Sequence, residues 1–248
     1  MRGVILSAGR GTRLGHYTHT VPKVMMDMGG MPVLEHGILL FKKHGIEEIF
    51  INLHYCPEVI QNYFGDGRKW GVSIRYHFEK ELLGTAGAVK AFEEWMDRGE
   101  EILVLYGDNL TDCDLTAMRC FHKGKKGMLT MAFIEEEDVS KSGIIAFDDD
   151  YRVVRMVEKP KADEVFSHWV NAGILLLEHK VLDLIPKEEF YDFGYQLLPK
   201  MVREGMDVYA YPMKGYLISL DTPEYYHKAQ EIFRLKEQRG IIRNGKNE

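Results

Sequence analysis

The chain has 248 residues, of which 45% are hydrophobic and 11% aromatic, enough for the core of one large α/β domain or two small ones. Its formal net charge of −6 argues against a general nucleic-acid-binding surface. The three cysteines are odd in number and lack the paired spacing of metal ligands, which favours a reduced, cytoplasmic protein. The sequence has no signal-like start and no long apolar run, so we expect neither secretion nor a membrane span.

The first half of the chain alternates between predicted strands and predicted helices. Short apolar runs rich in β-branched residues predict strands at residues 3–6, 49–53, 72–76 and 102–106. Helical spacing of apolar residues predicts helices at residues 32–44, 57–64 and 85–96. This alternation predicts an α/β fold in which a mostly parallel sheet is covered by helices.

The second half is richer in strands. Strand-like segments follow at residues 128–134, 143–147, 153–157, 170–177, 208–211 and 216–220, with only two helices between them. We therefore expect a mixed central sheet, completed by antiparallel strands within a single Rossmann-like domain. A charged amphipathic helix is predicted at 223–239. Because no linker or repeat divides the chain, we expect one domain, residues 1–240, and a flexible tail, residues 241–248.

The segment after the first predicted strand has the composition of a phosphate-binding loop. The strand ends at Leu6 and runs into Gly9-Arg-Gly11-Thr-Arg13. Glycines let the backbone approach phosphate oxygens, and open α/β sheets bind phosphate-bearing ligands at this edge. Arg13 can bind a phosphate bidentately, and Lys23 adds a second positive charge. Each feature alone also fits an ordinary turn or a surface residue, but within one short stretch they indicate a polyphosphate site.

Other candidate residues stand at the ends of later predicted strands. Asp108 follows the strand at 102–106 and is a candidate Mg²⁺ ligand, although an acidic residue there can also cap a helix. The turn at 83–87 leaves room for a base or for close helix packing. The remaining candidates offer an acceptor, a cation and an amide for sugar hydroxyls and a second phosphate: Glu158, Lys159, Asn171 and Gly173.

In collinear order these segments resemble the sugar-1-phosphate nucleotidyltransferases, also called NDP-sugar pyrophosphorylases. The likeness starts with Gly9-Arg-Gly-Thr-Arg13, Pro22-Lys23 and Gly30-Met-Pro32. It continues through Leu83-Gly-Thr-Ala-Gly87, Tyr106-Gly-Asp108, Gly143-Ile-Ile, Glu158-Lys-Pro160, Asn171-Ala-Gly173, residues 192–199 and Asp221-Thr-Pro-Glu224. It therefore covers nearly the whole chain.

The resemblance implies the nucleotide-diphospho-sugar transferase fold and a Mg²⁺-dependent nucleotidyl transfer from a nucleoside triphosphate to a sugar 1-phosphate, with release of pyrophosphate. It implies catalytic roles for Arg13, Lys23 and Asp108. The nucleotide would be bound by residues of the first loop and of the 83–87 turn: Leu6, Ala8, Gly9, Gly11, Thr12, Arg13, Lys23, Gly84, Thr85 and Gly87. The sugar phosphate would be bound by residues at later strand ends: Gly143, Glu158, Lys159, Asn171 and Gly173.

One departure from the family pattern concerns the second metal ligand. The family usually reads Asp-Ile-Gly-Thr-Pro-Glu, with the first Asp as ligand, and this chain has Ser219 at that position. Asp221 stands two positions later, and residues two apart on a strand face the same side, so we expect Asp221 to join Asp108 at the metal. The alternative is that Asp108 holds Mg²⁺ with waters and phosphates.

The substrates are indicated by two segments. Gly84-Thr-Ala-Gly87 looks like the segment of guanylyltransferases and some adenylyltransferases. Residues 22–36 look like those of mannose-type and manno-heptose-type guanylyltransferases, which favours GTP and a manno-type hexose or heptose 1-phosphate. Glucose 1-phosphate and UTP, CTP or ATP stay open as substrates. We expect these small molecules, and neither nucleic acid nor membrane, as partners of a monomer or small homo-oligomer.

Two other classes of protein stay open. Asp112-Cys-Asp114 fits the Asp-x-Asp pattern of GT-A-type glycosyltransferases, although Asp114 is also placed to cap the next helix. A catalytically inactive, nucleotide-sugar-binding regulatory subunit is the other alternative, and the altered segment from Ser219 to Asp221 keeps it open.

Overall fold

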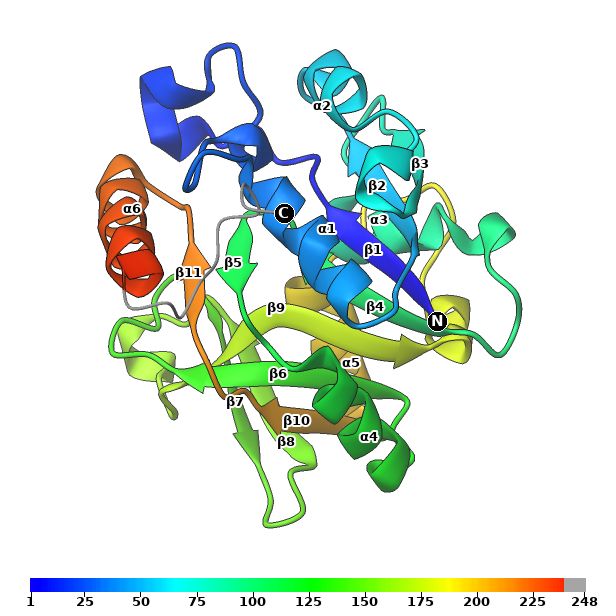
Figure 1. Cartoon of the computed structure of the whole chain (residues 1–248). Helices are drawn as coiled ribbons and strands as arrows, with labels where there is room; N and C mark the ends of the chain where they lie inside the picture. The colour runs from blue at the N-terminus through cyan, green and yellow to red at the C-terminus, as the bar shows by residue number, and fades with distance from the viewer. Residues whose placement is uncertain (239–248) are drawn as a thin grey trace.

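A computed structural model, which describes residues 1–238, has a nine-stranded sheet at its centre (Figure 1). Seven strands follow one another in the order β10-β6-β9-β4-β1-β2-β3, and β7 joins β9 and carries β8. The strands are β1 (Arg2–Leu6), β2 (Glu48–Leu53), β3 (Ser73–Phe78), β4 (Glu101–Tyr106), β6 (Leu129–Glu135), β7 (Gly143–Phe147), β8 (Val153–Glu158), β9 (Trp169–Glu178) and β10 (Val208–Pro212).

The sheet is mixed and mostly parallel, as predicted. Strands β4, β1, β2 and β3 run parallel to one another, and β10 runs parallel to β6. Strand β9 lies antiparallel between β4 and β6, and β7 and β8 form an antiparallel pair beside it. The predicted α/β class with a mixed, mostly parallel sheet is therefore confirmed.

Helices cover both faces of the sheet. The helices are α1 (Val33–Lys43), α2 (Pro57–Phe64), α3 (Gly84–Lys90), α4 (Leu115–Lys125), α5 (Leu198–Arg203) and α6 (Pro223–Gln238). Apolar residues of α1, α2 and α4 form one core, and those of α3 and α5 form another on the opposite face. Adjacent residues of β1 belong to different cores, because successive side chains of a strand point to opposite faces. Val4 packs in the core with α3 and α5, and Ile5 packs in the core with α1, α2 and α4.

The register of the strands sets the position of the site. Leu6 at the end of β1 pairs with Asn52 in β2 and with Tyr106 at the end of β4. The segments that follow Leu6 and Tyr106 therefore leave the same edge of the sheet.

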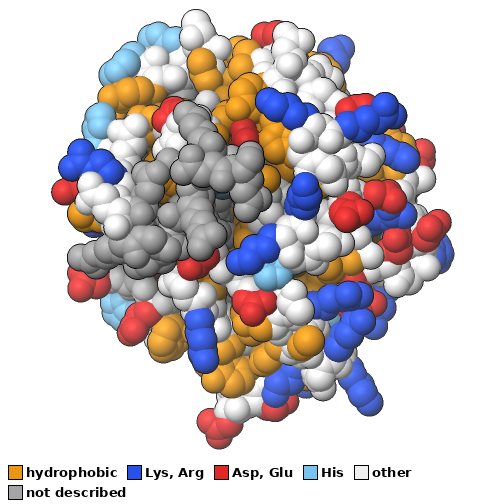
Figure 2. Space-filling view, in the orientation of Figure 1, with side chains coloured by type: hydrophobic (Ala, Val, Ile, Leu, Met, Phe, Trp, Pro, Cys, Tyr) orange, Lys and Arg blue, Asp and Glu red, His pale blue; other side chains and the backbone are white. Residues whose placement is uncertain are grey.

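In the view of Figure 2, positive and negative side chains are interspersed over the surface. Among the described residues, no helix is both long and apolar enough to cross a membrane.

Two elements differ from the sequence predictions, and one predicted boundary is not tested. Residues Leu217–Ser219 (β11) do not extend the central sheet, because they pair with Asn109–Thr111 (β5), a short strand that the sequence analysis did not find. The helix expected at 85–96 ends at Lys90 and is followed by a 3₁₀ turn, Glu93–Trp95. Just before this turn Phe92 stacks on Phe50, so tertiary packing here outweighs the helical spacing of the apolar residues. The predicted boundary between residues 1–240 and the tail lies outside the described residues.

Candidate active site

Two adjoining cavities lie at the edge of the sheet where β1 and β4 end. The larger has a volume of about 460 Å³ and the smaller about 250 Å³. Residues that line both are Thr85, Tyr106, Asp108 and Asp192. A ligand that bridged the cavities would therefore pass Asp108.

The first loop holds Lys23 in place through a glycine. Gly11 has φ = +65°, and a Cβ there would lie 2.9 Å from Cβ of Lys23, so only glycine lets the two segments approach this closely. The Thr18 hydroxyl donates a hydrogen bond of 3.0 Å to the Gly11 carbonyl, which fixes the loop. Gly11 and Thr12 line neither cavity, unlike Ala8 and Gly9.

Lys23 is the centre of a charged cluster between the two cavities. Its Nζ atom donates to Asp108 and, over 2.9 Å, to Oδ1 of Asp221, which also accepts from Arg13 Nη2 at 3.0 Å. Only 8% of the Lys23 side chain is exposed. Burial lowers the pKa of Lys23, but the two carboxylates outweigh burial and raise it above the ordinary value. The side chain is therefore a fixed cation at neutral pH.

Asp221 lies in this cluster, two residues beyond the end of β11 at Ser219 and therefore not on the strand itself. Burial alone would raise the pKa of Asp221, but Lys23 and then Arg13 hold it below its ordinary value. Because Asp108 and Asp221 bond to the same nitrogen atom, their oxygens converge on one point. Carboxylate oxygens are the ligands that Mg²⁺ prefers, so this donor set fits that ion.

The smaller cavity contains a buried carboxylate that the sequence analysis missed. Glu79, directly after β3, is 3% exposed and lines the cavity together with Asn52. Its oxygens accept hydrogen bonds from Asn52 Nδ2 (2.7 Å) and from the Leu83 backbone N–H (2.9 Å). Asn52 in turn accepts from the Ser7 N–H at 2.7 Å. The sequence signal was a polar residue inside the apolar run of β2 and an acidic one just after β3.

The larger cavity brings together all five residues expected to bind the sugar phosphate: Gly143, Glu158, Lys159, Asn171 and Gly173. Glu158 lies between Gly143 and Gly194, where an added Cβ on either glycine would collide with its carboxylate. Burial raises the pKa of Glu158 to about 7, with a smaller contribution from Asp192 and partial opposition from Lys159. Glu158 therefore changes charge near neutral pH.

A hydrogen-bonded clasp forms the wall that the cavities share. The Thr85 hydroxyl donates to Asp192 (2.8 Å) and accepts from the Phe193 N–H (2.8 Å). Gly84, with φ = +73°, lines the smaller cavity and packs against the Tyr191 backbone, where a Cβ would lie 2.6 Å from the carbonyl oxygen. Gly87 packs against the Glu189 carbonyl and lines neither cavity, so close chain packing explains this glycine.

The two aspartates of the Asp-x-Asp pattern lie outside both cavities. Asp112 accepts a hydrogen bond from the Tyr216 N–H at 2.7 Å. Asp114 accepts from the Ala117 N–H at 2.9 Å and caps α4, as predicted. Both therefore have local structural partners.

The fold and the charged junction are typical of α/β proteins that bind phosphate-bearing ligands at the carboxyl edge of the sheet. A family model described as "Nucleotidyl transferase" matches residues 2–231, and the chain belongs to this family of enzymes. The sequence is 35% identical over 245 residues to a UTP–glucose-1-phosphate uridylyltransferase of Synechocystis sp., with 94% of this chain and 63% of that protein covered. It is 31% identical to a mannose-1-phosphate guanylyltransferase of Mycobacterium tuberculosis, covering 89% of this chain and 61% of that protein.

A solved structure of similar length supports the same family. HddC from Yersinia pseudotuberculosis is 28% identical, with a TM-score of 0.77 over 94% of this chain and 99% of that one. HddC has also been solved in complex with GMP-PN. The chain thus spans about three fifths of the curated relatives that it matches and nearly all of HddC.

Proposed function

We propose that this chain transfers a nucleotidyl group from a nucleoside triphosphate to a sugar 1-phosphate. A phosphate oxygen of the sugar 1-phosphate attacks the α-phosphorus, and the bond from that phosphorus to the β-phosphate bridging oxygen breaks, so pyrophosphate leaves. The observation that carries this proposal is the cluster of Arg13, Lys23, Asp108 and Asp221 at the junction of two cavities. The nucleotide would occupy the smaller cavity and the sugar phosphate the larger.

Positioning and charge are sufficient for this reaction. The attacking group is already an anionic oxygen, so no base is needed to activate it, and the main barrier is the repulsion between two anions. Lys23, held by two carboxylates, is preorganised to stabilise charge around the α-phosphate. Arg13 is 58% exposed in its side chain, which leaves its guanidinium free to contact the β- and γ-phosphates.

The donor set also supports Mg²⁺ as cofactor. Asp108 and Asp221 would hold the ion, with Lys23 beside them. When bound, the ion would offset the negative charge of the triphosphate.

Glu79 supports guanine as the preferred base. The Watson–Crick edge of guanine presents two neighbouring donors, the ring N–H and the exocyclic amino group, which suit a carboxylate. Uracil presents one N–H between two carbonyl acceptors, and these would face a carboxylate unfavourably. Each Glu79 oxygen has one hydrogen bond from the protein and keeps a second lone pair for the base. The guanylyltransferase relative and the GMP-PN complex of HddC agree with this preference.

The larger cavity supports a polyhydroxylated sugar phosphate. Glu158 and Asn171 offer acceptors for hydroxyls, and Lys159 offers a cation for the phosphate. A manno-type hexose or heptose 1-phosphate is our preferred substrate, by the sequence likeness described above.

A substrate panel tests the proposal. Purified protein with Mg²⁺ is incubated with each of GTP, UTP, CTP and ATP against mannose, manno-heptose and glucose 1-phosphates, and pyrophosphate release is measured. We expect release only when both substrates are present, and fastest with GTP and a manno-type sugar. No release from any pair would contradict the reaction, and consumption of a finished nucleotide sugar without pyrophosphate would indicate a glycosyltransferase instead.

A further inference from the structure

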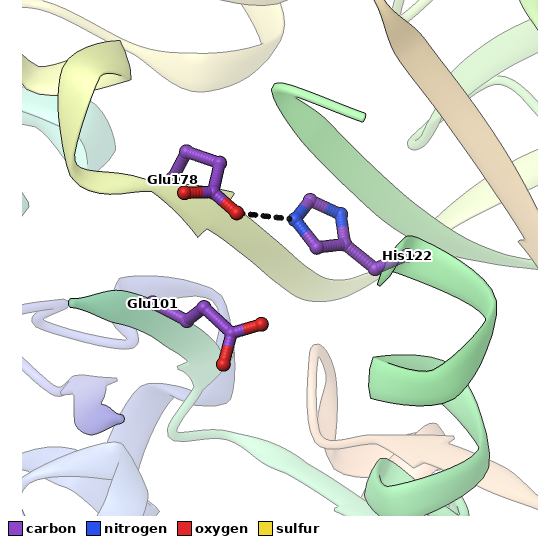
Figure 3. A group of neighbouring side chains, drawn as sticks. All are labelled: Glu101, His122 and Glu178. Atoms are coloured by element: carbon purple, nitrogen blue, oxygen red, sulfur yellow. Dashed lines mark hydrogen bonds and ion pairs between the residues drawn. The ribbon is translucent and has the colours of Figure 1, made fainter. Parts of the chain in front are cut away.

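A second cluster of ionisable side chains lies at the opposite end of β4 from Asp108. Glu101 begins β4, Glu178 ends β9, and His122 comes from α4 (Figure 3). Glu101 and Glu178 are direct partners in the antiparallel β4–β9 register. One potential ligand atom from each of the three side chains lies within 4.8 Å of the others.

His122 is oriented as metal-binding histidines usually are. It is 1% exposed, and its Nδ1 lies 2.8 Å from the hydroxyl of Thr130, a fully buried residue of β6. When Nδ1–H donates to this hydroxyl, Nε2 carries the free lone pair. Nε2 lies 3.3 Å from Glu178 Oε1, and Figure 3 shows the ring and this carboxylate pointing toward each other.

Glu101 contributes an oxygen without a hydrogen-bond donor. The residue is 8% exposed, and its buried Oε1 accepts no hydrogen bond within residues 1–238. Arg119 Nε donates to the other oxygen at 2.6 Å, and Lys123 Nζ stays 3.8 Å from Oε1. Arg119 and Lys123 counter the charge of Glu101 but leave Oε1 without a hydrogen bond, and a buried acceptor without a donor is costly. A metal ion bound between Glu101 and Glu178 would remove this penalty.

We propose that Glu101, His122 and Glu178 form a binding site for a divalent transition-metal ion of the Zn²⁺ type, separate from the proposed catalytic site. One imidazole and two carboxylates are a ligand set that Zn²⁺ accepts, whereas Mg²⁺ rarely takes nitrogen. Ligands bound at about 2.0–2.1 Å in a tetrahedral site lie about 3.3–3.4 Å apart, which matches the spacing of His122 and Glu178. Water would complete the coordination.

The ion would fasten α4 to two strands of the central sheet. Arg119 can keep its bond to Glu101 Oε2 and so hold that carboxylate in place. The Lys123 side chain is 58% exposed and can turn into solvent when an ion approaches Oε1. The proposal does not depend on the proposed reaction.

Calorimetric titration of Zn²⁺ into the full chain tests the site. The parent protein carries Asp108→Asn, so that the proposed catalytic pair of carboxylates is broken while Lys23 keeps its bond to Asp221, and it is first treated with a chelator. We expect one equivalent of Zn²⁺ to bind. His122→Gln or Glu178→Gln in this parent should lower the affinity at least tenfold. His44→Gln is the matched control, because His44 bonds to Thr116 of α4 outside the cluster.

A second experiment locates the bound ion directly. Anomalous diffraction from crystals of the parent grown with Zn²⁺ should give a peak bounded by Glu101, His122 and Glu178. Equal affinity of the parent and His122→Gln, or a peak only at other residues, would overturn the proposal. Circular dichroism checks that each variant folds, and if His122→Gln fails to fold, Glu178→Gln and the anomalous peak answer the same question.

Discussion

The two cavities share one wall but differ in their chemistry. The smaller is lined by apolar residues such as Val24, Leu82 and Phe190, with the buried carboxylate of Glu79 among its few polar groups. The larger is lined by charged groups of both signs, among them Glu136, Asp138, Lys141 and Lys228. A flat base is well served by apolar walls and a few fixed acceptors, whereas a sugar phosphate needs many polar partners.

The different linings of the two cavities suit one edge of the sheet to binding two chemically different ligands. In the proposed function, specificity for each ligand would come from side chains that the other cavity lacks, Glu79 on one side and Glu158 on the other. Charge and rigidity would come from the shared wall, which contains Asp108 and the Thr85–Asp192 clasp. Substitutions in the shared wall should therefore affect both substrates, and substitutions in one cavity should affect only one.

Asp108→Asn should have the largest effect. It removes one of the two carboxylates proposed to hold Mg²⁺, so we expect kcat to fall about 10³-fold, equivalent to about 4 kcal/mol in the barrier. Steady-state kinetics of pyrophosphate release measures the loss. The fold should be retained because Lys23 keeps its bond to Asp221.

Asp114→Asn is the matched control for this change. Asp114 lines neither cavity, and Asn caps a helix about as well as Asp, so kcat should stay at the wild-type value. If Asp108→Asn turned over as fast as Asp114→Asn, Asp108 would have no part in the chemistry.

Thr85→Val tests the shared wall. Valine has nearly the shape of threonine but leaves the Phe193 N–H and one Asp192 oxygen without their partner. We expect a loss of about 2–3 kcal/mol in the free energy of unfolding, measured by urea denaturation, and higher KM values for both substrates. Thr85→Ser keeps the hydroxyl and should lose less than half as much. A rise in only one KM would show that the cavities are independent.

Glu79→Gln tests the nucleotide cavity alone. A hydrogen bond from the base to a charged carboxylate contributes about 1.5–3 kcal/mol, so its loss should lower kcat/KM for GTP about 10- to 100-fold. The loss for UTP should be smaller, and the ratio of the two separates base recognition from general damage to the fold. Glu81→Gln, at an exposed position nearby, should leave the ratio unchanged. Equal losses for both nucleotides would contradict the role of Glu79.

Much of the fold could be predicted because buried strands and helices leave local patterns. Strand β7 and helix α2 have the predicted bounds, since β-branched runs and a helix-opening Pro57 are signals within one segment. The pairing of β5 with β11 had no such signal. It joins short segments far apart in the chain, and neither segment is long enough to show alternation.

The site was predictable to the extent that its residues stand at strand ends. Lys23, Asp108 and Asp221 meet as the sequence analysis expects, although they come from three distant segments. Gly11 and Gly87 were predicted to bind the nucleotide but line neither cavity, and their neighbours, the Lys23 stem and the Glu189 carbonyl, are set by tertiary packing. Glu79 was missed for the same reason, since its burial depends on Asn52 and Leu83.

Glu158→Gln should have the smallest effect on catalysis, and its effect on stability should depend on pH. Because burial raises the pKa of Glu158 from its ordinary value of 4.5 to about 7, folding favours the protonated carboxyl. Its contribution to stability is therefore complete below pH 4.5 and is lost as the pH rises through 7. Glutamine cannot ionise, so the variant should match the wild type well below pH 4.5 and exceed it by about 3 kcal/mol at pH 8 in urea unfolding. In kinetics the same variant should raise only the KM for the sugar 1-phosphate, because Glu158 lines only the larger cavity. A stability difference that did not change with pH would assign the raised pKa to another group and would leave the larger cavity without a titrating carboxyl.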